Sequence, residues 1–135
     1  PGGYSPLQGP GSVQMTGFSS FGPADDGRIK PDLVANGWLL LSTYIADSYF
    51  AVAAGTSMAA PHVSGVAALV QAHNPDFGPL DVKASIMDGV DGLPSLEGIT
   101  LTGGRLNAYS ALAQGGEPPE PPGAPTQLLV KQAAK

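Results

Sequence analysis

A serine and a histidine that could do chemistry lie five positions apart in residues 55–65, GTSMAAPHVSG. The Gly-Thr-Ser sequence is typical of a turn, and the small apolar residues 66–70 that follow predict a helix. Ser57 would then lie in the first helical turn, where unpaired backbone N–H groups and the positive end of the helix dipole favour negative charge. A hydroxyl whose attack on a carbonyl creates an oxyanion suits this position, so the stretch predicts a nucleophile.

Two structural alternatives compete with that chemistry. Judged by position alone, a serine at the start of a helix is more often an N-cap than a nucleophile. His62 is unsuited as a base for Ser57, because five helical positions separate two side chains by about 140° around the axis and about 7.5 Å along it. A hydrogen bond needs a separation of ~3 Å. We therefore predict that His62 is a buried structural histidine bonded to the backbone.

Composition and charge limit the classes of protein to which this chain can belong. The 135 residues include 6 Lys and Arg against 11 Asp and Glu, which gives a net charge of −5 and argues against nucleic acid or an anionic membrane as a partner. The chain has no cysteine, and no apolar run approaches the roughly 20 residues of a membrane span. With 19 Gly and 14 Pro, the chain is expected to form one compact, loop-rich domain. It begins at Pro1 without an initiator Met, so we expect a piece of a longer protein.

Short apolar runs predict several strands before the candidate nucleophile. The strongest is residues 38–43, which is apolar on both faces as in a covered parallel sheet. Weaker strand candidates are residues 12–15, residues 30–35 and residues 49–54.

Three helices are expected after these strands: residues 56–72, residues 79 to about 89 and residues 108–113. The first should bury an apolar stripe at helical spacing. Its predicted members are Ala59, Val63, Val66, Ala67 and Val70, with Met58 and Leu69 widening the stripe. Pro61 is compatible with this helix if it falls within about the first turn, where its missing N–H has no partner to lose.

Residues 55–65 resemble, residue for residue, the nucleophile segment of the subtilisin-like serine proteases, or subtilases. Residues 18–23 (FSSFGP) and 25–35 (DDGRIKPDLVA) resemble the segment that precedes that nucleophile, and residues 103–108 (GGRLNA) resemble the one that closes the domain. The resemblance implies a three-layer α/β subtilisin-like fold with a parallel sheet, of which residues 1–114 form only the C-terminal portion. Residues 115–125 are expected to be a Pro-rich linker, and residues 126–135 a tail or the start of a further module.

The resemblance also implies roles for individual residues. Ser57 would be the nucleophile and its backbone N–H an oxyanion donor, with Gly55, Thr56 and Met58 supporting it. The triad order in subtilases is Asp, His, Ser. No histidine precedes Ser57, so the triad Asp and His, like the family's oxyanion Asn, would belong to sequence upstream of Pro1. The implied activity is serine endopeptidase in a parent protein, with this chain inactive alone.

Two other functions and one metal site stay open as alternatives. The parent could be a non-catalytic subtilase-like scaffold, or a binding module could begin at Thr126, although the residues that follow are too few to fold alone. Asp25 and Asp26 could ligate Ca²⁺, but two adjacent carboxylates fit a solvated turn better, and no metal is assigned. No cofactor is certain, although structural Ca²⁺ in the parent protein stays open. The implied partners are polypeptide substrates and the missing N-terminal part of the catalytic domain, and the implied location is extracellular.

Overall fold

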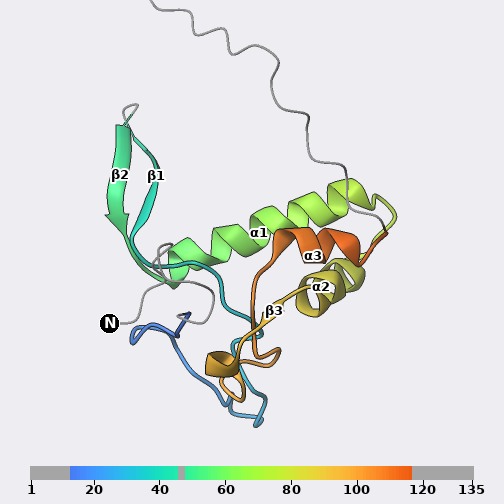
Figure 1. Cartoon of the computed structure of the whole chain (residues 1–135), viewed down its shortest axis with the longest axis horizontal. Helices are drawn as coiled ribbons and strands as arrows, with labels where there is room; N and C mark the ends of the chain where they lie inside the picture. Colours follow the sequence, from blue (N-terminus) through green and yellow to red (C-terminus); the bar gives the residue numbers. More distant parts are fainter. Residues whose placement is uncertain (1–12, 46–47, 117–135) are drawn as a thin grey trace, which may run out of the picture.

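The computed structural model describes residues 13–45 and 48–116, in which three helices pack together and a hairpin projects from one end (Figure 1). Most of the predicted linker and all of the predicted tail lie outside these residues, as does Ser12. Residues 13–15, predicted as part of a strand, carry no regular structure. The elements in order are β1 (Leu40–Tyr44), β2 (Ser48–Ala53), α1 (Thr56–His73), α2 (Pro79–Asp88), β3 (Asp91–Gly92), a 3₁₀ turn (Pro94–Leu96), β4 (Gly104–Arg105) and α3 (Ala108–Ala113).

The three predicted helices are confirmed, and α2 and α3 carry local signals at their starts. Helix α2 begins after Gly78, whose N–H donates to Asp81 Oδ2 at 2.8 Å, and the proline at its first position suits a helix start. Helix α3 is capped by Asn107, whose side-chain oxygen accepts the Ser110 N–H at 3.0 Å. Pro61 lies a turn later than expected, at the sixth residue of α1. It therefore leaves the Ser57 carbonyl without its usual helical partner, at an exposed part of the helix that water can reach.

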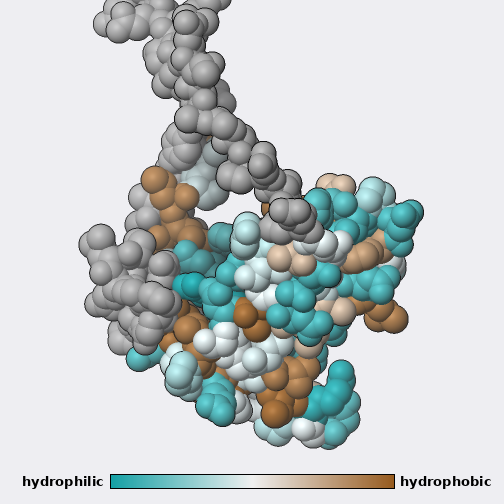
Figure 2. All heavy atoms as spheres, turned by 45° about the vertical axis from the view of Figure 1, so that its right-hand side comes forward, coloured by the Kyte–Doolittle hydropathy of each residue, from teal (hydrophilic) through white to brown (hydrophobic). Residues whose placement is uncertain are grey.

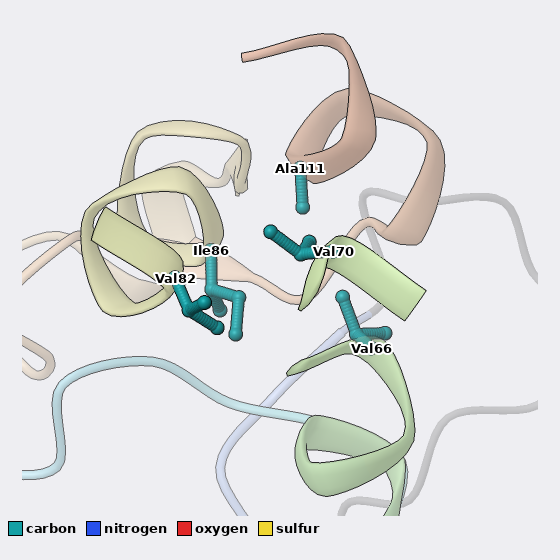
Figure 3. Close-up of a cluster of buried hydrophobic side chains, with 5 residues drawn as sticks. All are labelled: Val66, Val70, Val82, Ile86 and Ala111. Carbon is teal, nitrogen blue, oxygen red and sulfur yellow. The ribbon is translucent and has the colours of Figure 1, made fainter. Parts of the chain in front are cut away.

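The core lies where the three helices meet. Figure 3 shows its buried members pointing toward one another: Val66, Val70, Val82, Ile86 and Ala111. They come from α1, α2 and α3. The predicted stripe is correct in its centre but too wide, since Leu69 is 52% exposed. Among the described residues, α2 and α3 cover only the face of α1 that carries Val66 and Val70.

Val70 and Leu69 offer a matched test of this packing. Val70 is fully buried, so Val70→Ala should lower the free energy of unfolding by about 2 kcal/mol through lost burial and a cavity. Leu69→Ala removes more carbon from an exposed position and should cost less than ~0.5 kcal/mol. Urea unfolding of both variants, followed by circular dichroism, measures the difference. Equal losses would contradict the arrangement of α1 in the core.

The hairpin differs from the predicted strands. Strands β1 and β2 pair antiparallel, and Leu41 on β1 is 69% exposed. The parallel pairing expected for residues 38–43 is therefore wrong for the described residues, in which β1 pairs antiparallel with β2 and no other segment encloses it. Figure 1 shows the pair extending away from the helices, and Figure 2 shows hydrophobic surface where it projects. A two-stranded hairpin is only marginally stable on its own. Exposed apolar side chains on such a hairpin indicate a surface that another part of a protein covers.

Parallel pairing in the described residues occurs at one isolated bridge, between Val34 and Arg105. The Val34 N–H donates to the Gly104 carbonyl at 3.1 Å, and the Leu106 N–H donates to the Val34 carbonyl at 2.8 Å. β4 also pairs antiparallel with β3. Residues 30–35, predicted as a strand, thus contribute a bridge rather than a full strand. The mixture of helices and strands agrees with the expected α/β class.

The carboxylate of Asp91 links β3 to β4 and should make stability depend on pH. Asp91 accepts from Asn107 Nδ2 at 2.8 Å and from Arg105 Nη2 at 2.6 Å. The hydrogen bond from Asn107, and then that from Arg105, lower the pKa of Asp91 below its ordinary value. A lowered folded-state pKa gives stability that is present above the unfolded value of about 4 and is lost as pH falls through the folded value.

Asp91→Asn should therefore destabilise the chain at pH 7 and weaken the decline of stability between about pH 5 and pH 2. Thermal unfolding of both proteins across this range measures the effect. Asp88→Asn, which also removes one carboxylate from an exposed position at the end of α2, is the control for the change in net charge. Parallel pH curves for Asp91→Asn and the unsubstituted chain would refute the linkage.

Candidate active site

A corner between β2 and α1 positions the candidate nucleophile. Gly55 has φ 157° and ψ 161°, a region that essentially only glycine occupies. Its N–H donates to the Gly37 carbonyl at 2.8 Å, and its own carbonyl accepts the Met58 N–H at 3.0 Å. A Cβ on Gly37 would lie 2.7 Å from the Gly55 oxygen. Two glycines therefore allow the backbone contact that fixes where α1 begins.

Ser57 is the second residue of α1 and is exposed. The N-cap is Gly55 and no side chain caps the helix, so the alternative that Ser57 is an N-cap does not apply. Within the described residues, neither the Thr56 nor the Ser57 N–H has a backbone acceptor. The first turn of α1 carries no acidic side chain either. The hydroxyl thus stands beside free N–H donors at the positive end of an eighteen-residue helix.

His62 makes the backbone contact predicted for it, but on the surface. Its Nδ1 lies 2.8 Å from the Met58 carbonyl, which can only accept, so Nδ1 carries the proton and donates. The side chain is exposed rather than buried, which corrects that part of the prediction. Because the ring turns back toward Met58, it does not bond Ser57, and a Ser57–His62 dyad is absent from the described residues.

A cavity of about 370 Å³ opens beside the corner. Its wall includes Gly55, Thr56 and the aromatic side chains of Phe18 and Trp38, whose rings stack with centroids 5.8 Å apart. His62 also lines it, whereas Met58 is half-buried next to the corner. Neither Gly37 nor this aromatic pair was predicted as part of the site. An isolated glycine between apolar runs, as at Gly37, is a signal of close backbone approach that could have indicated it.

The acidic turn at residues 25–27 is solvated, as predicted. Asp26 is exposed and pairs with Arg28, whose Nε lies 2.6 Å from Oδ2, and this hydrogen bond lowers the pKa of Asp26. No group of three or more metal-ligating side chains occurs in the part of the chain that the structure describes. In that same part, none of the helices has the length and apolar character needed to cross a membrane.

The model of the subtilase family matches residues 10–112 of the chain. The chain belongs to the subtilase family. The serine protease AprX of Bacillus subtilis is 32% identical to this subtilase over 111 residues, which cover 73% of the chain and 25% of AprX. The CO(2)-response secreted protease of Arabidopsis thaliana is 34% identical over 109 residues, covering 70% of the chain and 14% of that protein.

A solved structure described as the basis of subtilase cytotoxin SubAB assembly superposes with a TM-score of 0.57 and 29% identity. The superposition covers 62% of this chain and 26% of that one. The fold is therefore that of a partial subtilisin domain, and the subtilase described above spans a quarter or less of the length of the two curated relatives.

Proposed function

We propose that this chain is the C-terminal part of the catalytic domain of a serine endopeptidase, with Ser57 as its nucleophile. The hydroxyl oxygen attacks the carbonyl carbon of a peptide bond, and a histidine from the remainder of the domain takes its proton. The Ser57 N–H donates to the oxyanion that forms. Loss of the amine leaves an acyl group on Ser57, which water then removes.

The observation that carries this proposal is the exposed hydroxyl at the start of α1, beside N–H donors that have no described partner, in a member of a protease family. Gly55 and Thr56 shape the backbone of the corner, and Met58 packs beside it. Electrostatic stabilisation by such preorganised donors is often the largest contribution to this kind of catalysis.

The chain by itself should be inactive, because a serine hydroxyl without a general base is a poor nucleophile. No histidine precedes Ser57 in this sequence, and His62 is engaged with the Met58 carbonyl. The triad Asp and His and the further oxyanion donor are therefore assigned to the missing N-terminal part of the domain. We extend the proposal to polypeptide substrates and to secretion, which the name of the Arabidopsis relative supports. Residues 115–125 would link the domain to whatever follows.

A phosphonofluoridate probe tests the proposal, since it forms a phosphonyl ester with an activated serine as fluoride leaves. The full-length protein should be labelled on Ser57, and the 135-residue chain should not. A correctly folded full-length protein without an adduct on Ser57 would instead favour a non-catalytic subtilase-like scaffold.

A further inference from the structure

The loop that contacts the corner contains an asparagine followed by a glycine. Asn36 and Gly37 belong to no helix or strand, and both line the cavity beside the corner. Asparagine in this setting is prone to lose its side-chain amide, because the next backbone nitrogen can attack the side-chain carbonyl carbon and glycine has no Cβ to obstruct it. The contacts of the Gly37 nitrogen and of the Asn36 side chain decide whether the fold permits that attack.

The backbone nitrogen of Gly37 is available in the part of the chain that the structure describes, where its N–H has no hydrogen-bond acceptor. Gly37 contacts Gly55 through its carbonyl oxygen, which accepts the Gly55 N–H at 2.8 Å, and through the side of its Cα. These contacts hold Gly37 in place without occupying its nitrogen.

The side chain of Asn36 is held in the position that the attack needs. Its Oδ1 accepts the Trp38 N–H at 3.4 Å, and this bond spans Gly37 and folds the side-chain amide back over the Gly37 nitrogen. The same bond polarises the side-chain carbonyl and stabilises the negative charge that develops on its oxygen during attack. No described residue accepts a hydrogen bond from Nδ2, the atom that must leave.

We propose that Asn36 is a site of spontaneous deamidation through a cyclic imide. The Gly37 nitrogen loses its proton to solvent base and bonds to Cγ of Asn36, and the Cγ–Nδ2 bond breaks as ammonia leaves with a proton. Water then adds to one of the two carbonyl carbons of the imide and breaks the bond of that carbon to nitrogen. Addition at Cγ gives aspartate, whereas addition at the backbone carbonyl carbon gives isoaspartate, in which the main chain runs through Cγ.

Isoaspartate displaces the corner, because it places an additional carbon in the main chain before Gly37. The contact between Gly37 and Gly55 has no room for such a shift, since even a Cβ on Gly37 would lie 2.7 Å from the Gly55 oxygen. The modification therefore moves the start of α1 as the protein ages. Its effect on catalysis rests on the proposed function, whereas the modification itself does not.

Mass spectrometry of proteolytic peptides tests the modification in the folded 135-residue chain, incubated at mildly alkaline pH. The readout is conversion of amide to acid at residue 36, which isomerisation of aspartate cannot imitate because it leaves the mass unchanged. Asn36 in the folded chain should convert within about tenfold of its rate in a blocked peptide of residues 34–38, as expected for a loop that needs little opening. Slower conversion than this would show that the fold protects Asn36 and would overturn the proposal.

The other two asparagines of the chain are internal controls. Asn74 precedes a proline, whose nitrogen carries no proton, and Asn107 precedes an alanine and donates from Nδ2 to Asp91 at 2.8 Å. Both should persist while Asn36 is converted. Conversion of Asn107 as fast as that of Asn36 would also overturn the proposal. Asn36→Gln keeps a side-chain amide but would need a six-membered ring, so conversion at residue 36 should fall below detection over the same period.

Amide hydrogen exchange reads the effect on the corner, in the isoaspartate form separated by chromatography from the unmodified chain. The Gly55 amide should exchange at least about tenfold faster in that form, and the Val66 amide inside α1 should not change. Unchanged exchange at Gly55 would refute the displacement of the corner. In the full-length protein, labelling of Ser57 by the phosphonofluoridate should fall as isoaspartate accumulates. Absence of labelling before any modification would refute the proposed activity alone, since conversion at Asn36 is measured by mass.

Discussion

Ser57→Ala should lower the kcat of the proposed full-length protease by about 10⁶-fold, the size known for loss of the nucleophile in subtilisin, a member of the same family. The substitution removes the oxygen that forms the acyl bond. It keeps the backbone N–H of residue 57, so the residual rate should reflect substrate binding and the oxyanion donors alone. Hydrolysis of a peptide amide and labelling by the phosphonofluoridate probe measure the loss.

Ser64→Ala is the matched control for this prediction. Ser64 lies on the same helix and is also exposed, but its hydroxyl donates to the Ala60 carbonyl at 3.3 Å and lies outside the first turn. Its removal should leave kcat within about twofold of the unsubstituted value, because this hydroxyl lies away from the corner, and should change stability little. Ser57→Ala should also leave the melting temperature unchanged, because its hydroxyl has no described hydrogen bond. Full activity in Ser57→Ala would place the nucleophile elsewhere.

The helices could be predicted from the sequence because their signals are local. A proline at the first helical position and Asp81 two residues later mark the start of α2, and Asn107 marks the start of α3. The strands could not be placed as well, because their environment depends on partners far away in sequence. Residues 38–43 are apolar enough for a buried strand, yet β1 forms an antiparallel hairpin with β2 and leaves Leu41 in solvent.

The candidate site, too, could be predicted where its signals are local but not where it depends on residues far apart in the sequence. The position of Ser57 at the start of α1 follows from a contiguous motif, and the conclusion that His62 faces away from it follows from helix geometry alone. Burial of His62 could not be predicted, since it depends on what packs against the outer face of α1. The contact between Gly37 and Gly55 joins residues eighteen positions apart, and no helical or strand period indicates it.

Gly37→Ala should lower kcat/KM by about 10²-fold in the proposed full-length protease, although residue 37 takes no part in the chemistry. The added Cβ would lie 2.7 Å from the Gly55 carbonyl oxygen and 3.4 Å from the Cβ of Ala59, so the corner must shift. Because the same carbonyl accepts the Met58 N–H, the shift moves the first turn of α1 and with it the Ser57 hydroxyl. The loss should appear mainly in kcat, with a cost in unfolding free energy of about 1–3 kcal/mol from the overpacked contact.

Gly92→Ala separates this effect from a general cost of adding a methyl group to glycine. Gly92 is exposed, and a Cβ there meets no atom within 4 Å, so activity and stability should change little. Steady-state kinetics at a temperature well below the melting point of each variant distinguish a displaced nucleophile from a partly unfolded protein. A Gly37→Ala enzyme with normal kcat would mean that the Gly37–Gly55 contact does not position Ser57, because the start of α1 would then tolerate a displaced carbonyl.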